Sequence, residues 1–185
     1  SLATDTPVLD GQSHEDRTDG SLMSRVHHYS WDELQMLANS LADSIGRKHP
    51  KIDVVIGVAR GGCFPALLLS YLLKVRHLTT IQVITTVSEA TRAERSPPIV
   101  SSAPREEVIQ GRCCLLVDDV TNTGATLETA TTALLKLKPS RLVTAAMVWD
   151  TVSPDPNEPR LTKCFSDFIG SEVHAWASFP WLPSN

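Results

Sequence analysis

Two alternating patterns of hydrophobic and polar residues run along the chain. Short apolar or β-branched runs, typical of buried strands, occupy four segments: residues 53–58, 79–86, 113–119 and 142–148. Apolar residues recur at helical spacing in residues 65–75 and 124–136, each between two of these strand segments. Strands that alternate with helices predict an α/β fold with a mainly parallel sheet flanked by helices.

A further helix is predicted ahead of the first strand. Ser30 and Glu33 have the spacing of a capping box, in which each side chain accepts a hydrogen bond from a free amide of the first helical turn. Apolar residues follow at helical spacing over residues 34–45, and Gly46 is expected to end the helix.

Two segments depart from this alternation. Residues 1–25 are polar, with few large apolar side chains, so we expect a disordered or loosely attached tail ahead of one folded domain at residues 26–185. Residues 88–111 are rich in proline, serine and charge. A loop of that length inside a compact domain is either an ordinary disordered insertion or a lid over a site.

The composition narrows the classes of function. The 185 residues are 42% hydrophobic with a formal net charge of -4, which suits one globular domain and argues against nucleic acid as a main partner. The longest apolar stretch, residues 66–73, is too short to span a membrane. The polar N-terminus lacks the pattern of a secretory signal, so a cytoplasmic location is expected. The four cysteines match no metal or disulfide spacing and are predicted to be reduced structural thiols.

The segment LLVDDVTNTGATL, residues 115–127, carries the candidate chemistry. Asp118 and Asp119 stand at the carboxyl end of a predicted strand, where ligands bind in open α/β sheets. Paired carboxylates can accept hydrogen bonds from sugar hydroxyls or hold a divalent cation, and the amides and hydroxyls of residues 121–126 suit a phosphate at a helix start. A phosphosugar site uses all of these groups. A solvated strand end followed by a helix cap is the alternative.

This segment resembles the signature by which type I phosphoribosyltransferases bind phosphoribosyl pyrophosphate (PRPP): an apolar strand, two acids, two further residues and a small polar loop. In that family the two acids contact the ribose hydroxyls and the loop binds the 5-phosphate. The resemblance implies a PRPP site that includes these residues of the segment: Asp118, Asp119, Thr121, Asn122, Thr123, Gly124, Ala125 and Thr126.

A second match, GVARGG, follows the first predicted strand at residues 57–62. Glycines let backbone amides approach an anion closely, and an arginine can neutralise its charge. The segment is similar to the pyrophosphate loop of the family, in which a cis peptide bond often precedes the arginine. Carried over, that bond joins Ala59 to Arg60, and the resemblance implies that Ala59, Arg60, Gly61 and Gly62 also bind PRPP.

The third match, HAWASFPW at residues 174–181, is similar to the aromatic segment that closes the base pocket in the xanthine-guanine and hypoxanthine enzymes. Trp176 is the candidate for stacking on the base, and Ala177 is expected to contribute backbone contacts. Phe179 and Trp181 are interpreted as packing residues.

The three matches imply the type I phosphoribosyltransferase fold, with a flexible lid loop and a small C-terminal hood. They imply an Mg2+-dependent glycosyltransferase of nucleotide metabolism and purine salvage, which transfers the phosphoribosyl group of PRPP to a ring nitrogen of a nucleobase and releases pyrophosphate. The catalytic residues would be Arg60, Asp118, Asp119 and Asn122, with Mg2+ on the two acids. The resemblance also implies a homo-oligomer.

Two positions depart from the purine enzymes. Asn122 stands where they commonly have an aspartate that handles the N7 proton of the base, and an amide cannot accept a proton at neutral pH. Asp150 lies near the place where oxopurine enzymes carry a lysine that donates to the 6-oxo group. Asn122 and Asp150 are therefore candidate base contacts, and the hypothesis is an acceptor other than a standard 6-oxopurine, such as an amino-bearing or modified heterocycle. Alternatively, Asp150 points to solvent and backbone groups alone read the base.

Another class of function stays open at this point: a regulatory protein that keeps the fold but senses PRPP or a nucleotide without turnover. The amide at Asn122 slightly favours a sensor, whereas Arg60 beside the glycines favours an enzyme. A Rossmann oxidoreductase is disfavoured because no G-x-G-x-x-G motif follows the first predicted strand.

Overall fold

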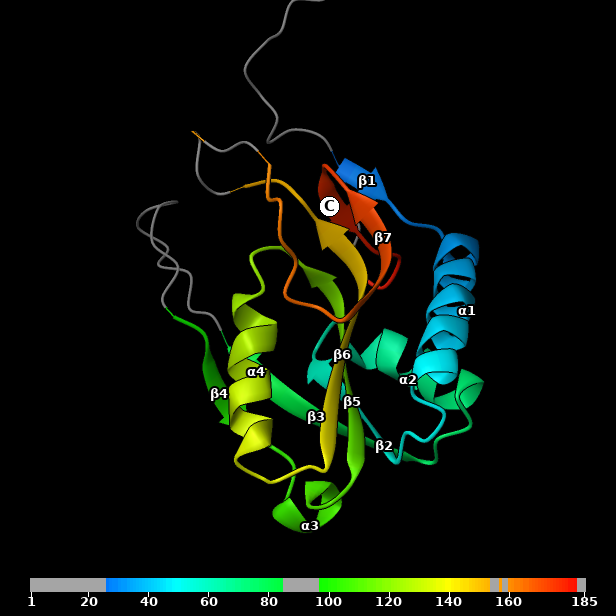
Figure 1. The fold of residues 1–185 in the computed structure, drawn as a ribbon. Helices are drawn as coiled ribbons and strands as arrows, with labels where there is room; N and C mark the ends of the chain where they lie inside the picture. The colour runs from blue at the N-terminus through cyan, green and yellow to red at the C-terminus, as the bar shows by residue number, and fades with distance from the viewer. Residues whose placement is uncertain (1–25, 85–96, 154–156, 158–159, 183–185) are drawn as a thin grey trace, which may run out of the picture.

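The computed structural model describes residues 26–84, 97–153, 157 and 160–182. The described strands form a six-stranded sheet in the order β4-β3-β2-β5-β6-β7 and a second sheet of β1 and β8 (Figure 1). The elements in chain order are β1 (Val26–His28), α1 (Trp31–Lys48), β2 (Val54–Ala59), α2 (Cys63–Leu72), β3 (His77–Ile84), β4 (Ile99–Ser102), α3 (Glu106–Ile109), β5 (Cys113–Thr121), α4 (Ala125–Leu135), β6 (Arg141–Asp150), β7 (Phe168–Val173) and β8 (Trp176–Ser178).

The main sheet lies between two helical layers, with α1 and α2 on one side and α4 on the other (Figure 1). Successive side chains of a strand point to opposite faces, so Val55 and Leu115 pack with α1 and α2 whereas Ile56 and Leu116 pack with α4. Among the described strands of this sheet, every pair is parallel except β3 with β4. The predicted mainly parallel sheet flanked by helices is therefore confirmed.

The helix α1 begins as predicted and ends later than predicted. The Ser30 hydroxyl accepts a hydrogen bond from the Glu33 amide, and the Glu33 carboxylate accepts one from the Ser30 amide. Gly46 does not end the helix, which continues to Lys48. Ile45 is fully buried beneath this last turn, and its packing outweighs the weak helix preference of glycine. None of the described helices is long and apolar enough to cross a membrane.

The prediction of one long loop at residues 88–111 is wrong for its second part. Residues 88–96 lie outside the described residues, as do residues 1–25 of the predicted tail. Within residues 97–111, β4 pairs antiparallel with β3, and α3 contributes the buried Ile109 to the core under α4. The strand β4 was missed because it is short and lies beside prolines. As an edge strand of the sheet it tolerates them.

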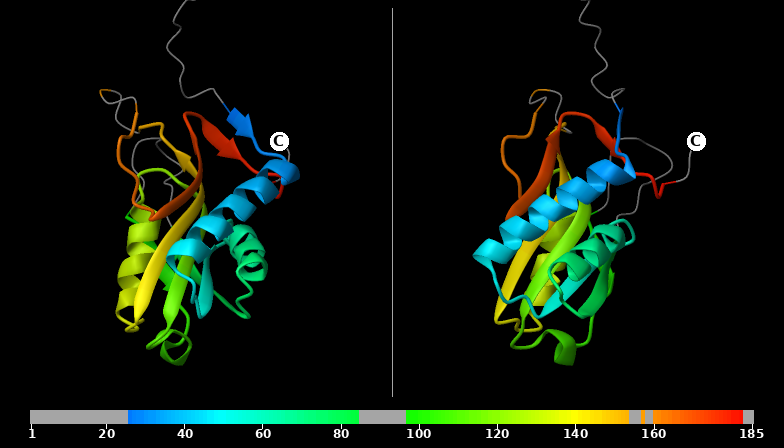
Figure 2. Two further views of the ribbon diagram at one scale, coloured as in Figure 1. Left: turned by 45° about the vertical axis from the view of Figure 1, so that its right-hand side comes forward. Right: turned by 90° about the vertical axis from the view of Figure 1, so that its right-hand side faces the viewer.

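Three strands were not predicted: β7 and β8, which lie near the C-terminus, and β1, which pairs with β8. The strand β7 extends the main sheet beside β6, with Ile169 opposite Ala146. The strands β1 and β8 run side by side, with Val26 opposite Trp176, near the carboxyl end of β6 (Figure 2). Each of these two strands has three residues, too few for a periodic pattern to show.

Candidate functional site

The glycine loop after β2, residues 57–62, and the acidic pair of β5 lie at the point where the connections between strands begin to lead to opposite edges of the sheet. From β2 the chain passes through α2 to β3 on one side, and from β5 it passes through α4 to β6 on the other. β2 and β5 are parallel neighbours, with Gly57 opposite Val117, so their carboxyl ends are adjacent. Ligands of open α/β sheets bind at such a reversal, outside the carboxyl ends of the strands.

Close approach of the backbone joins the two motifs. A Cβ atom added at Gly61 would overlap the Asp119 carboxylate, and one added at Gly62 would press on the β5 backbone, so both positions need glycine. The peptide bond between Ala59 and Arg60 is cis, as the resemblance implied. The Arg60 side chain is exposed, which leaves its guanidinium open to an anion that meets the loop.

The acidic pair is enclosed at the end of β5, which runs two residues further than predicted. Asp118 is only 6% exposed, and its Oδ1 accepts a hydrogen bond from the Asp119 amide at 3.0 Å. Asp119 Oδ1 accepts a hydrogen bond from the Val120 amide at 2.9 Å. Burial raises the pKa of both carboxyl groups, and the negative charge of Asp119 raises that of Asp118 further. The ionised form of such a pair is stabilised most by a partner that supplies positive charge or hydroxyl donors.

The turn after β5 is tight and opens directly into α4. Gly124 has a φ of 88°, in the left-handed region that favours glycine, and a Cβ atom there would collide with Phe165. The amides of the first turn of α4 have no helical partners and suit an anion. The other residues of the predicted phosphate loop differ in exposure: Thr121 is buried, Thr126 is half-buried, and Thr123 and Ala125 are exposed.

Asn122 holds the ends of two strands together, a role that the sequence did not indicate. Its Nδ2 donates hydrogen bonds to the carbonyl oxygens of Asp150 at 2.9 Å and Val152 at 2.6 Å. An aspartate could donate neither bond, so an amide suits this position for structural reasons. With both amide hydrogens engaged, the side-chain oxygen is the atom that Asn122 can offer to a base.

Asp150 ends β6 and is buried, with an exposure of 5%, so the alternative in which it points to solvent is wrong. Its Oδ1 accepts a hydrogen bond from the Val152 amide at 2.8 Å. Burial raises the pKa of Asp150, while that hydrogen bond and the nearby His174 oppose the shift. The Thr151 amide also donates to the Val173 carbonyl at 2.9 Å, which ties the end of β6 to the segment that leads into β8.

Trp176 and Ala177 lie on β8, apart from the acidic pair in the sequence. Trp176 is 58% exposed, so an indole face is available to a planar ring, whereas Ala177 is buried. The structure brings Asn122 and Asp150 together at the ends of β5 and β6. No hydrogen bond or ring contact of the described residues joins Trp176 to Asn122 or Asp150.

Trp181 was interpreted from the sequence as a packing residue, and it also lies at the acidic pair. Its ring stacks between Phe64 and Phe179. Its indole nitrogen is buried without a partner in hydrogen-bonding geometry among the described residues. The indole nevertheless lies near enough to Asp119 to lower the pKa of that carboxyl group. The segment HAWASFPW indicated aromatic packing. It gave no signal for the approach of Trp181 to Asp119, which depends on how α2 and β5 pack.

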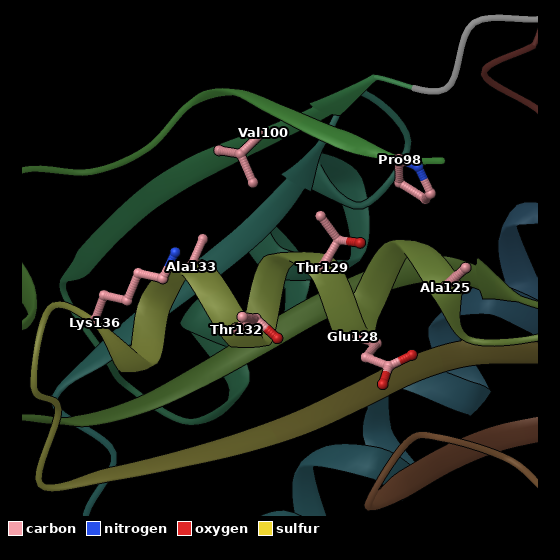
Figure 3. Close-up of a pocket in the computed structure, with 8 residues that line it drawn as sticks. All are labelled: Pro98, Val100, Ala125, Glu128, Thr129, Thr132, Ala133 and Lys136. Atoms are coloured by element: carbon pink, nitrogen blue, oxygen red, sulfur yellow. The ribbon is translucent and has the colours of Figure 1, made fainter. Parts of the chain in front are cut away.

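A separate hollow of about 510 Å³ lies between α4 and β4 (Figure 3). Thr129 and Ala133 point from α4 toward Val100 of β4 (Figure 3). Ala125, at the start of α4, is the one predicted site residue in its lining. Because the hollow includes neither the acidic pair nor the glycine loop, it does not carry the predicted chemistry.

Comparisons with known proteins point to one family. Residues 29–184 match the family model described as the phosphoribosyl transferase domain. The chain is 28% identical over 158 residues to a xanthine-guanine phosphoribosyltransferase of Cereibacter sphaeroides, a match that covers 83% of this chain and 85% of the relative. It is also 28% identical over 160 residues to the xanthine-guanine phosphoribosyltransferase of Ruegeria sp., covering 83% and 84%.

Two solved structures show the same fold. The purine phosphoribosyltransferase of Pyrococcus horikoshii has a TM-score of 0.68 at 24% identity, and the match covers 87% of this chain and 96% of that one. The xanthine-guanine-hypoxanthine phosphoribosyltransferase of Helicobacter pylori has a TM-score of 0.66 at 20% identity, covering 84% and 93%.

Proposed function

The chain belongs to the phosphoribosyl transferase domain family, and on that premise we propose that it transfers the 5-phosphoribosyl group of PRPP to a ring nitrogen of a purine base and releases pyrophosphate. Its curated relatives are xanthine-guanine phosphoribosyltransferases, which supports a purine acceptor and a role in purine salvage. The observation that carries the proposal is the contact between Gly61 and the Asp119 carboxylate. That contact sets backbone amides suited to a pyrophosphate beside carboxylates suited to a ribose.

We assign the binding of PRPP to both motifs. Asp118 and Asp119 accept hydrogen bonds from the ribose hydroxyls, the start of α4 binds the 5-phosphate, and the glycine loop binds the pyrophosphate. The transition state of such a transfer carries positive charge on the ribose, which adjacent carboxylates stabilise. Arg60 neutralises charge on the departing pyrophosphate. Most of the rate then comes from holding sugar and base in line.

The acidic pair also fits Mg2+, because hard oxygen ligands suit this ion. No group of three or more His, Cys, Asp or Glu side chains that could hold a metal occurs in the described parts of the chain. Asp118 and Asp119 would therefore hold Mg2+ together with oxygens of the substrate, as is usual for this ion at phosphate sites. When bound, Mg2+ would neutralise negative charge on the leaving group.

For the base side we propose contacts from Asn122, Asp150, Trp176 and Ala177. The exposed indole of Trp176 suits stacking on a heterocycle. The oxygen of Asn122 and the buried carboxylate of Asp150 are acceptors, which favours a base that presents amino or ring N–H groups. On these two acceptors alone we keep the hypothesis that a standard 6-oxopurine is not the preferred acceptor; xanthine and guanine, the bases in the names of the curated relatives, are themselves 6-oxopurines, and the turnover assay below decides between the two.

We also propose that the protein is a homo-oligomer that covers an apolar face of α2. This helix has no charged residue, yet Phe64, Leu67 and Tyr71 are 44%, 43% and 77% exposed at its surface. A helix that is apolar on all sides is normally buried. Light scattering of the intact protein and of Tyr71→Glu tests the proposal. We expect a multimer that the substitution weakens, and a monomeric wild type would contradict it.

The experiment for the activity is pyrophosphate release from PRPP and Mg2+ with hypoxanthine, guanine, xanthine, adenine and uracil in separate reactions. Turnover of at least one purine is expected. Tight binding of PRPP by calorimetry with no turnover of any base would instead favour a regulatory sensor, which the curated relatives do not support. Efficient turnover of hypoxanthine would contradict the hypothesis about 6-oxopurines while leaving the transfer reaction in place.

A further inference from the structure

A stack of aromatic rings runs from the N-terminal elements to the glycine loop. Trp181 lies nearly parallel to Phe179, at a centroid distance of 4.8 Å and an angle of 3°, and to Phe64, at 4.8 Å and 10°. Tyr29 continues the stack beyond Phe179 at 5.7 Å. Trp31 packs on Trp181 from another side, tilted by 52° at 5.7 Å. Because these rings come from separate segments, they fix the plane of the Trp181 indole.

The stack brings Trp181 to the acidic pair through α2. Phe64 lies in the first turn of α2, and Gly61, three residues earlier, has its backbone against the Asp119 carboxylate. A ring stacked on both faces can contact other neighbours only at its edge, where the indole carries its N–H group. That nitrogen is buried, and no atom of the described residues accepts a hydrogen bond from it. A buried donor without a partner is uncommon in native proteins and calls for an explanation.

The Asp119 carboxylate is an acceptor that lies close to the indole. Burial raises the pKa of Asp119 overall, while hydrogen bonds within the acidic pair and from Val120, and lastly the nearby Trp181 side chain, lower it. The Val120 amide donates to Oδ1, while Oδ2 faces the Gly61 backbone. Cys63 also borders the pair, but burial and the charges of Asp119 and Asp118 raise the pKa of its thiol, so it supplies no charge to compete with the indole.

We propose that Trp181 is a positioning residue: the aromatic stack holds its indole N–H toward the Asp119 carboxylate and so keeps that carboxylate oriented for the ribose hydroxyls of PRPP. The inference rests on the proposed function for the identity of the ligand. Trp181 itself need not touch the substrate, because it acts through Asp119.

The first test reads the contact in the free protein by nitrogen-15 NMR. The indole N–H signal of Trp181 is identified by its loss in Trp181→Phe and is then followed in Asp119→Ala. We expect this signal to move upfield when its acceptor is removed. The signal of Trp31, which packs on the same stack, should keep its position. An unmoved Trp181 signal would overturn the inference. The test needs no PRPP, and it uses Trp181→Phe only to assign the signal.

The second test measures the consequence for PRPP. Trp181→Phe keeps an aromatic ring in the stack but removes the N–H together with part of the indole, and we expect the Kd and KM for PRPP to rise about tenfold with little change in kcat. Trp31→Phe makes the same exchange on a neighbouring ring that does not border Asp119, and it should leave both constants unchanged.

The outcomes separate this inference from the proposed function. Wild-type affinity for PRPP in Trp181→Phe would contradict the positioning role. A fall in kcat and a loss of stability without a change in Kd would also contradict it, because they would indicate a packing role alone. If the wild-type protein binds no PRPP, the proposed function fails, and the NMR signal alone decides whether the indole points to Asp119.

Discussion

The phosphoribosyl side of the candidate site and its base side are built in different ways. On the first side, the glycine loop and the acidic pair follow two neighbouring strands, and the pairing of Gly57 with Val117 fixes their relative position. On the second side, Asn122, Asp150 and Trp176 come from three segments that are joined through side-chain bonds, loops and a separate small sheet. Backbone pairing leaves little freedom for the first side, whereas the second can change with a few contacts.

This difference has a consequence for mutations. Changes on the phosphoribosyl side should affect PRPP with every base, because its geometry is shared by all reactions of the enzyme. Changes on the base side should alter the choice among bases and leave PRPP binding intact. Variants on the two sides can therefore test this division.

The largest effect is expected for Asp119→Ala. The variant would lack the carboxylate and its charge-assisted hydrogen bonds to the ribose, each worth roughly 1.5–3 kcal/mol. The kcat/KM for PRPP should therefore fall about a thousandfold with any base. The measurement is initial-rate kinetics with PRPP varied at a saturating base concentration.

Asp53→Ala is the matched control, because Asp53 lies at the opposite end of the same two strands. Its Oδ2 accepts a hydrogen bond from the Cys113 amide at 2.9 Å. Its loss should lower the free energy of unfolding by roughly 1–3 kcal/mol and leave the KM for PRPP unchanged. Equal losses of activity in the two variants would show that the acidic pair has no special role.

The next effect in size is expected for Gly61→Ala. The added methyl group would overlap the Asp119 carboxylate and force it to rotate, and a small displacement of a positioning group can reduce the rate by about a hundredfold. Kinetics with PRPP would show the loss. Gly46→Ala is the control: its Cβ would lie 3.7 Å from Leu73 Cδ2, and it should stabilise α1 by up to about 1 kcal/mol with normal activity. Normal kinetics of Gly61→Ala would contradict the close contact.

The sequence predicted well the helices, strands and loops that carry the phosphoribosyl side of the candidate site, because their signals are local. The capping box of α1, the buried strands and the two motifs each lie within a short segment, and parallel pairing follows from the alternation of strands and helices. The cis bond at Ala59 is present where the family resemblance implied it.

The remaining features depend on contacts between distant residues. The strands β1 and β8 exist through their mutual pairing, and each has too few residues to show a pattern. The role of Asn122 depends on where the loop after β6 passes the end of β5. The approach of Trp181 to Asp119 depends on the packing of α2 against the aromatic stack. No local pattern carries that information, which is why the sequence indicated binding and catalytic roles for Asn122 but not its hydrogen bonds to the end of β6.

On the base side, Trp176→Ala should raise the KM for the base about tenfold and leave the KM for PRPP unchanged. Stacking of a base on an aromatic side chain is worth roughly 1–3 kcal/mol, and the exposed indole on β8 is the candidate surface. Trp176→Phe keeps an aromatic face and should retain most of the affinity. Kinetics with each substrate varied in turn distinguishes the two sides. A parallel rise in both KM values would contradict the division.

The smallest effect is expected for Asp150→Asn, which sharpens the hypothesis about the base. The substitution removes a buried carboxylate that repels a carbonyl oxygen, while the amide oxygen can still accept the hydrogen bond from Val152. Use of 6-oxopurines should rise roughly fivefold, as a gain of about 1 kcal/mol implies. Kinetics with hypoxanthine and adenine in parallel would show the shift, and unchanged selectivity would contradict a base contact by Asp150.

The pH dependence of stability gives Asp150→Asn a second measurement that does not involve substrates. Burial raises the pKa of Asp150 above its ordinary value of 3.8, with the Val152 amide and His174 opposing the shift. Between 3.8 and the raised pKa, the folded protein binds more protons at this site than the unfolded chain does, so the contribution of Asp150 to stability falls as pH rises through that window. The variant lacks this loss. Its urea midpoint should exceed that of the wild type at pH 7. The difference between the two midpoints should disappear as the pH falls to 3.8 and below. A difference that stays constant with pH would indicate an altered contact rather than a buried charge.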